Sequence, residues 1–537
     1  MTKMKALTLF LVTLFSLGMM MPLTVSMAQE EKVLNVAIAS EPPSIDPGLG
    51  NENISGAVIR NAFERLTWLD TDGVPQPAAA ESWDISEDGM TYTFHIRKDT
   101  QWTNGEPVTA HDFEYSWKRV LNPDTLSQSA ALFYIIEGAE AYNTGEGTVE
   151  EVAIKATDDY TLEVSLINPV PYFLDLINGQ AFSPVLQSVV EANPDWASEA
   201  SENYVSNGPF KLTEWVHHGN IVLEKNETYW DSDNVHLDAV NMHVIESQAT
   251  ANTAFQAGEI DYVGNPFTYV SLDAIELYRE NDQLTIADEG SVYYYTINTQ
   301  DEIMSNLNMR KALALAIDRQ ALVDNVLKGG EKPAMGLVPP SINGFEDKEA
   351  YFPDNDPEGA REYLALAMEE LDISDPADIT LSLIFNTSEA HSAVAQFIQN
   401  NWVENLGINV ELTNSEWQVH LDNMGNMDYQ VARLGWSSRY NDGTSLLNMY
   451  LTPATGNNYT GWESEEYQSL IKQADSELDA DKRIELLKEA EALFIADMPL
   501  IPIYYYSNPY VVQDYVINME PDSLGHVNLK PVDIVRE

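Results

Sequence analysis

The chain has 537 residues, 44% of them hydrophobic, which is enough for a sizeable core and predicts about two to four domains. It carries 85 acidic and 28 basic side chains, a formal net charge of -57, which argues against binding to nucleic acid or anionic lipid, since both need Lys and Arg. The absence of cysteine excludes disulfides, thiolate metal sites, iron–sulfur clusters and cysteine nucleophiles.

The first segment has the features of a secretory signal. Lys3 and Lys5 precede an apolar run over residues 7–21, and residues 26–28 supply the small side chains that a signal peptidase reads. An uncleaved anchor is the alternative, but the run is shorter than the roughly 20 residues of a membrane span. We therefore expect cleavage after residue 28 and a soluble periplasmic or extracellular protein without a lipid-anchor cysteine.

The acidic residues are spread along the whole chain. A dispersed acidic surface keeps a protein hydrated where salt screens its self-repulsion, so we expect a salt-rich habitat. A specific basic partner is the rival explanation, and it would favour a clustered patch instead.

Strands and helices alternate along the predicted chain. Strands are predicted where apolar residues run together or alternate, at 33–39, 92–96, 161–166, 221–224, 291–298, 431–436 and 500–506. Helices are predicted from apolar periodicity at 55–66, 309–327, 358–371, 392–406 and 481–494, with another that Thr109 caps. Asn308 is the expected cap of the helix at 309–327. The mixture indicates α/β or α+β lobes.

Motifs of catalysis and metal binding are absent from the sequence. There is no phosphate-binding loop, dinucleotide fingerprint, nucleophile elbow or zinc-binding helix motif. His217 and His218 are adjacent, so a strand would point them to opposite faces, and surface positions are expected. Residues 84–89 resemble the start of a calcium loop, but His95 stands where the loop needs Glu. We therefore expect a hairpin turn there, and no metal, cofactor or catalytic residue.

Several segments together resemble extracellular solute-binding family 5, the receptors of peptide ABC importers. The closest resemblance is to the periplasmic oligopeptide-binding proteins. The matching segments keep the family order over essentially the whole mature chain, at 81–84, 92–98, 102–113, 206–210, 223–230, 258–261, 310–313 and 502–506.

The resemblance implies two lobes that close around an extended peptide. It implies a lobe I made of residues 29–63, 189–290 and 507–537, an extra domain over 64–188, and a lobe II over 291–506. The peptide's backbone would pair with strands, and its side chains would enter hydrated pockets, so sequence preference would be weak. The implied protein is monomeric, catalyses no covalent step, and delivers oligopeptides to the membrane permease subunits of an ABC importer.

The resemblance also implies the ligand-binding residues. Gly435 and Ser437 would pair with the peptide backbone, and Arg433 and His391 match polar positions near its carboxylate end. The remaining implied ligand residues are Trp436, Arg439, Asp442, Trp417, Tyr294, Tyr505, Asn51 and Asn53. Without the resemblance, the two tryptophans could equally belong to the core, Arg433 to a buried ion pair and His391 to a helix cap.

Arg439 departs from the family pattern. The family usually has an Asp there, which binds the peptide's α-ammonium, and Arg would repel that cation. Either Asp442 or Glu52 takes the ammonium instead, or the ligand lacks a free α-amine, or Arg439 pairs with a ligand carboxylate. In addition, Ser291 and Ser437 stand where some relatives have a cysteine pair.

Two rival functions stay open at this stage. The same receptor fold could bind another ligand, such as an N-blocked or acidic peptide, a muropeptide, a saccharide, an opine or a nickel chelate. A secreted hydrolase of peptide or glycan is the other rival, and it predicts turnover that depends on a carboxylate.

Overall fold

The structure is a computed structural model that describes residues 31–70, 73–453 and 457–536. The predicted signal at 1–28 lies outside these residues. Within the described ranges, no helix has both the length and the apolar character that crossing a bilayer requires.

The largest sheet has 11 strands, and its two halves come from different parts of the chain. In spatial order the first half consists of β15 (Asn409–Ser415), β14 (Thr380–Asn386), β16 (Val431–Ser437), β12 (Thr285–Ile297) and β17 (Leu500–Val512). The second half consists of β11 (Tyr262–Val263), β1 (Val33–Ile38), β10 (Ala239–Val244), β9 (Asn220–Lys225) and β8 (Phe210–Val216). The short β13 (Lys332–Pro333) pairs with β17.

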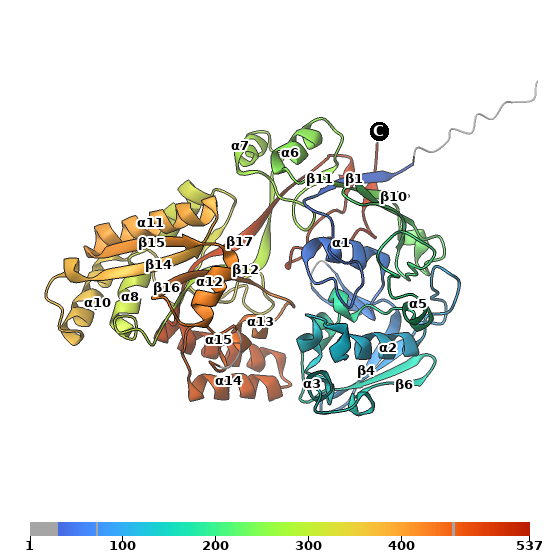
Figure 1. Cartoon of the computed structure of the whole chain (residues 1–537), viewed down its shortest axis with the longest axis horizontal. Coiled ribbons are helices and arrows are strands. Elements are labelled where there is room, and N and C mark those ends of the chain that lie inside the picture. The colour runs from blue at the N-terminus through green and yellow to red at the C-terminus, as the bar shows by residue number, and fades with distance from the viewer. Residues whose placement is uncertain (1–30, 71–72, 454–456, 537) are drawn as a thin grey trace, which may run out of the picture. The chain divides into compact units, whose positions relative to one another are not determined.

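Strands β12 and β17 run side by side and join the two halves (Figure 1). Each is longer than the sequence predicts, because they pair with each other beyond the predicted ends, from Thr285↔Tyr510 to Thr296↔Leu500. β17 then continues onto β11. These extensions contain polar and proline residues and lack the apolar alternation on which the prediction relied. They form strands because each pairs with the other.

A second, four-stranded sheet has the order β4 (Ala80–Ile85), β5 (Thr91–Ile96), β7 (Thr161–Ser165) and β6 (Ile154–Asp158). The alternation predicted for β5 is confirmed, with Tyr92, Phe94 and Ile96 buried. Helix α2 (Ala110–Leu121) contacts this sheet and begins with the predicted Thr109 cap, whose backbone N–H donates to Asp112 at 2.7 Å. The two-stranded pairs are β2 (Thr67–Leu69) with β3 (Pro75–Pro77), and β18 (Val516–Ile517) with β19 (Asp533–Ile534).

Helices flank the sheets, and α11 and α12 contact β14 and β15 (Figure 1). In the first half of the chain they are α1 (Asn53–Ala62), α3 (Ala139–Thr144), α4 (Phe173–Leu176), α5 (Gln187–Ala192), α6 (Gln248–Gln256) and α7 (Leu272–Glu280). In the second half they are α8 (Leu307–Leu315), α9 (Arg319–Leu322), α10 (Pro357–Glu370), α11 (Glu389–Leu406), α12 (Trp417–Gly425), α13 (Thr444–Leu447), α14 (Glu465–Ser476) and α15 (Ala480–Asp497).

The prediction of one helix over 309–327 is wrong. Helix α8 is capped by Asn306, not Asn308, and it ends at Leu315. The chain restarts at α9, where Asp318 accepts the N–H of Ala321 at 2.8 Å, and continues as a π-helical segment over 323–327. The break lets Arg319 reach a fully buried position, where it donates to the carbonyl of Pro502 at 2.8 Å.

The predicted helix at 55–66 also ends early, at Ala62. Beyond it, the backbone N–H of Glu64 donates to Asn207 at 2.9 Å, and Asn207 donates to the carbonyl of Glu64 at 3.0 Å. These distant bonds replace the helical ones, so local periodicity overestimates the helix.

The buried apolar side chains form three clusters. One draws on residues between 34 and 242 together with 262–267 and 510–534. A second draws on residues between 292 and 505. A smaller one joins Ala37 and Val511 to residues between 251 and 278. The domain division given above stays a prediction.

Candidate functional site

Three implied ligand residues of β16, Arg433, Gly435 and Ser437, share one face of the sheet with alternate residues of β12. The antiparallel register sets Ser437 opposite Ser291 and Gly435 opposite Tyr293. Alternate residues of a strand point to the same face, and two contacts confirm it here. The hydroxyls of Ser291 and Ser437 are 2.8 Å apart, and the Arg433 guanidinium carbon lies 4.6 Å from the centroid of the Tyr293 ring.

The backbone of β16 presents an edge that its neighbour leaves open. β14 pairs with β16 at Val431 and Ala432, and the register goes no further. The N–H of Ser438 donates to Gly290 in the β12 strand at 2.8 Å. Because backbone direction alternates along a strand, Gly435 and Ser437 turn their N–H and C=O groups away from β12. Such an edge suits an added peptide strand.

Arg433 is a buried cation for which the described residues supply no paired carboxylate. Only 9% of the residue is exposed to solvent. Its guanidinium donates to the Asn386 amide oxygen at 3.2 Å and to the Tyr506 hydroxyl at 2.9 Å. Among the described residues it forms no ion pair with a carboxylate. A buried charge without a counter-ion is costly, so an anionic ligand group would stabilise this arrangement.

His391 lies beside Arg433 and is uncharged at neutral pH. Burial, together with the charge of Arg433, lowers the pKa of His391 to about 4. Its ring centroid is 5.6 Å from that of Tyr293, and its Nδ1 has no hydrogen-bond partner among the described residues. Ser388 accepts the backbone N–H of His391 and caps α11, so His391 is not itself the cap residue.

The two implied tryptophans lie on the exposed side of this region. Trp417 opens α12, is 43% exposed and stacks on His420 with ring centroids 6.0 Å apart. His420 in turn bonds the carbonyl of Arg433 at 2.8 Å, which ties α12 to β16. Trp436 is half-buried, and the exposed Arg439 lies over it, 5.7 Å from the ring centroid. Trp417 is thus linked to Arg433 through His420, whereas Trp436 lies on the opposite face of β16.

Three other implied ligand residues are buried within the protein, and two of them have hydrogen-bond partners there. Tyr294 is fully buried, on the opposite face of β12 from Tyr293. The Tyr505 hydroxyl donates to the carbonyl of Gly336 at 3.0 Å. Asp442 accepts two hydrogen bonds from Arg483, at 2.6 and 3.0 Å. Asp442 is therefore already neutralised, which weakens its case as the acceptor of a peptide ammonium.

Asn53 is the first residue of α1, and Asn51 lies just before it, far along the chain from β12 and β16. Asn51 donates to Gln128 at 2.7 Å, and Asn53 donates to Asn265 at 3.3 Å. Between them, Glu52 caps α1 by accepting the N–H groups of Ile54 and Ser55, each at 2.7 Å. Its carboxylate is engaged, like that of Asp442.

Glu289 is a candidate that the sequence analysis missed. Its carboxylate accepts the hydroxyl of Ser291 at 2.9 Å, and Ser291 also contacts Ser437. It therefore lies on the same face as Gly435, and it forms no ion pair among the described residues. Burial raises its pKa. The predicted strand began at Ser291, so the alternation that would have found Glu289 stopped two residues short.

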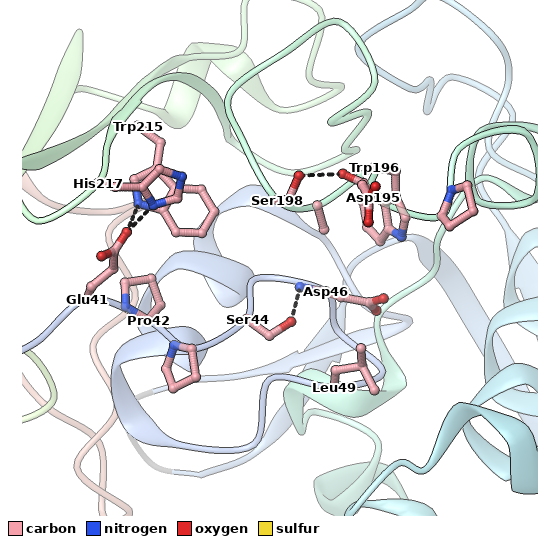
Figure 2. A pocket seen from close by; sticks show the side chains of 13 residues that line it. Glu41, Pro42, Ser44, Asp46, Leu49, Asp195, Trp196, Ser198, Trp215 and His217 are labelled. Atoms are coloured by element: carbon pink, nitrogen blue, oxygen red, sulfur yellow. Dashed lines mark hydrogen bonds and ion pairs between the residues drawn. The ribbon is translucent and has the colours of Figure 1, made fainter.

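The cavity shown in Figure 2 lies elsewhere and is lined by none of the implied ligand residues. Its volume is about 530 Å³. In Figure 2 the carboxylate of Glu41 faces Trp215 and His217, and it accepts the indole N–H of Trp215 at 2.9 Å. His218 also approaches Glu41, at 3.2 Å. The Glu41 carboxylate contacts both His217 and His218. The described residues contain no group of three potential metal ligands.

The sequence matches a known protein family and its relatives over most of the chain. A family model described as bacterial extracellular solute-binding proteins, family 5 Middle, matches residues 74–458. The oligopeptide-binding protein OppA of Bacillus subtilis (strain 168) is 45% identical over 496 residues, covering 92% of this chain and 91% of that protein.

Two solved structures are similar over nearly the full length. The unliganded open form of the murein tripeptide binding protein MppA has a TM-score of 0.80 at 28% identity, covering 95% of this chain and 98% of that one. OppA of Haemophilus influenzae in complex with the peptide RPPGFSPFR has a TM-score of 0.75 at 30% identity, covering 95% and 100%. The expectation of mixed α/β lobes in a bilobed binding-protein fold is confirmed.

Proposed function

This chain belongs to the bacterial extracellular solute-binding proteins of family 5, and from that premise we propose that it is a peptide receptor. It binds oligopeptides between two closing lobes outside the cytoplasm and delivers them to the permease of an ABC importer. The relative in Bacillus subtilis and the Haemophilus influenzae complex support this function. The predicted signal at 1–28 supports export, and the receptor acts as a monomer and catalyses no covalent step.

The observation that carries the proposal is the unpaired, buried Arg433. A peptide's carboxylate end supplies the anion that the protein does not, and Asn386 and Tyr506 hold the guanidinium for it. Neutral His391 adds a hydrogen-bonding nitrogen without further charge. A charge-assisted contact of this kind contributes about 1.5–3 kcal/mol.

The edge of β16 supplies sequence-independent affinity. Gly435 and Ser437 direct their backbone groups to the side where β14 no longer pairs, and a peptide there adds one more strand. Trp417 and Trp436 flank the added strand and give its side chains apolar surface. Backbone pairing does not read side chains, so we expect broad peptide specificity.

The peptide's α-ammonium is taken by Glu289. Asp442 and Glu52 are engaged within the protein, and Arg439 repels a cation. Glu289 is bound through Ser291 to Ser437 and carries no ion pair of its own. Burial raises the pKa of Glu289, and a nearby ammonium would lower it again by favouring the charged carboxylate.

We propose the lobes that the resemblance implies, with residues 29–63, 189–290 and 507–537 in lobe I, 64–188 in the extra domain and 291–506 in lobe II. The chain crosses between lobes near the two long strands β12 and β17. Closure brings Asn51 and Asn53 of lobe I opposite the β16 edge, where they complete the binding site.

The test compares tripeptides with free ends, with an acetylated amine and with an amidated carboxylate, by calorimetry on the purified protein. Arg433→Gln should weaken binding of the free tripeptide roughly tenfold to a hundredfold and leave the amidated tripeptide nearly unaffected. Arg361→Gln, an exposed arginine of α10, is the matched control. Equal affinity of wild type and Arg433→Gln for the free tripeptide would contradict the proposed carboxylate contact.

The acetylated tripeptide decides between ligand classes. Binding of free tripeptides alone supports Glu289 as the ammonium acceptor, and Glu289→Gln should then lose that preference. Binding of acetylated tripeptides alone points to N-blocked ligands such as muropeptides, in line with the likeness to a murein tripeptide binding protein. Binding of none would turn the search to saccharides, opines or nickel chelates.

A further inference from the structure

A second cluster of basic groups lies apart from Arg433, at the end of α1. Arg60, in the last turn of the helix, and Arg65, just after it, line a cavity of about 340 Å³. His526 and neighbouring residues near the C-terminus form part of its wall. The cavity has room for several water molecules or for a small anion with its own hydration.

Arg65 is buried and poorly bonded. The residue is 8% exposed, and its guanidinium reaches the carbonyls of Arg60 and Phe63 only at 3.4 Å each. Its Nε has no hydrogen-bond partner among the described residues. Within the same part of the chain, neither Arg65 nor Arg60 forms an ion pair with a carboxylate.

Arg60 is held by a neutral histidine. It donates to Nε2 of His526 at 2.9 Å, so that nitrogen must accept, and the proton of the ring lies on Nδ1. Nδ1 faces Asp522 at 3.3 Å, and Asp522 also accepts the N–H groups of Leu524 and His526. The Nε of Arg60 has no partner among the described residues.

Asp70, Glu520 and Asp522 also line the cavity, but none of the described acids forms an ion pair with Arg60 or Arg65. Asp70 accepts from Val74 at 2.8 Å and from Gln76 at 2.7 Å. Asp522 acts on Arg60, and Glu64 on Arg65, each through its charge without an ion pair, while Glu64 accepts the indole N–H of Trp230 at 2.8 Å. Burial, helped by the charge of Arg65, lowers the pKa of Arg60 to about 9, and burial lowers that of Arg65 to about 10.

The backbone around Arg60 is shaped for its guanidinium. Gly56, one turn earlier in α1, has no side chain, and a Cβ there would lie 2.5 Å from a terminal nitrogen of Arg60. Two neighbouring guanidiniums with unused donors repel each other. An anion between them would satisfy the donors and remove the repulsion.

We propose that Arg60 and Arg65 form a binding site for an oxyanion group, a carboxylate or a phosphate. Guanidiniums match both groups geometrically, because each offers paired N–H donors. The group could belong to an acidic side chain of the transported ligand or to a free inorganic anion. The site does not depend on the peptide role proposed above, and it would have the same chemistry in a receptor for another solute.

The first arm of the test measures the Tm of the purified protein in sodium phosphate and in sodium chloride of equal ionic strength. Matched ionic strength is essential, because the net charge of -57 makes the Tm sensitive to any salt. Phosphate should raise the Tm above the chloride value. Arg65→Gln should weaken that response roughly tenfold or more in phosphate concentration, and Arg361→Gln should leave it unchanged.

The second arm compares tetrapeptides that differ only by Glu or Gln at one position. If the oxyanion is part of the ligand, wild type prefers the Glu peptide and Arg65→Gln loses that preference while still binding the Gln peptide. If neither peptide binds the wild type, the proposed peptide function fails and the phosphate arm alone decides this inference. No phosphate response and no preference for Glu, in a protein that binds both peptides, would overturn the oxyanion site.

A control without oxyanions guards against a folding defect. In chloride alone, Arg65→Gln should have a Tm no lower than wild type, because it removes a buried charge that lacks a counter-ion. A markedly lower Tm in chloride would show that Arg65 is needed structurally, and would overturn the proposal.

Discussion

At the scale of the residue, the site depends on charges that the protein leaves uncompensated. Arg433 has hydrogen bonds to neutral groups and no carboxylate, while Asp442 and Glu52 have partners of their own. A receptor must keep some polar groups available for its ligand, and these groups reduce the stability of the empty protein. The unsatisfied Nδ1 of His391 fits the same pattern.

The depressed pKa of His391 predicts a pH dependence of stability. The unfolded chain takes up a proton near pH 6.5, whereas the folded protein does so near pH 4. Above about pH 6.5 the His391 ring is neutral in both states, so it adds no pH dependence to the free energy of unfolding. As the pH falls from about 6.5 to about 4, only the unfolded chain takes up the proton, so the free energy of unfolding decreases. His391→Asn should lose less stability than wild type over this range in urea unfolding. An NMR titration that places His391 near pH 6.5 would contradict this prediction.

The candidate residues of the site came from the family resemblance and stay predictions. The strand register adds that Arg433, Gly435 and Ser437 lie on one face of β16. Glu289 was missed because a strand's register decides which alternate residues face the ligand. The sequence shows the alternation, but the pairing partner that fixes its direction lies more than 100 residues away in the chain.

At the scale of the element, local patterns located fewer than half of the helices and strands among the described residues, mostly longer ones, and often missed their ends. The ends depend on distant contacts, as Asn207 shows for α1 and β17 shows for β12. The break between α8 and α9 is the clearest case, because apolar periodicity continues across it. The cap at Asp318 was visible in the sequence, yet the buried position of Arg319 that requires the break was not.

This break predicts a local dependence on Asp318. Its carboxylate accepts the N–H of Ala321 at 2.8 Å and the amide of Asn355 at 2.7 Å. Asp318→Ala should lower the free energy of unfolding by about 0.5–2 kcal/mol, the usual cost of losing a cap. Asp324→Ala, in the following segment, is the matched control and should change it little. Equal unfolding midpoints in urea for Asp318→Ala and wild type would show that the cap is dispensable.

At the scale of the whole molecule, the fold followed from the family resemblance, while the acidic surface is this chain's own feature. The net charge of -57 is carried by residues spread along the sequence. Ion pairs such as Arg119 with Asp46 use part of the small basic complement, so most acids face water or one another. Self-repulsion of this kind destabilises the compact state at low ionic strength.

We therefore expect the Tm of the purified protein to rise steeply between 0.1 and 1 M sodium chloride. The screening length shortens over this range from about 10 Å to about 3 Å, which removes repulsion between all but adjacent carboxylates. The rise should shrink as the pH is lowered toward the range in which carboxylates protonate, because the repelling charges are then lost. A Tm that is flat across these salt concentrations at neutral pH would mean that the acids are locally compensated, and the expected salt-rich habitat would lose its physical basis.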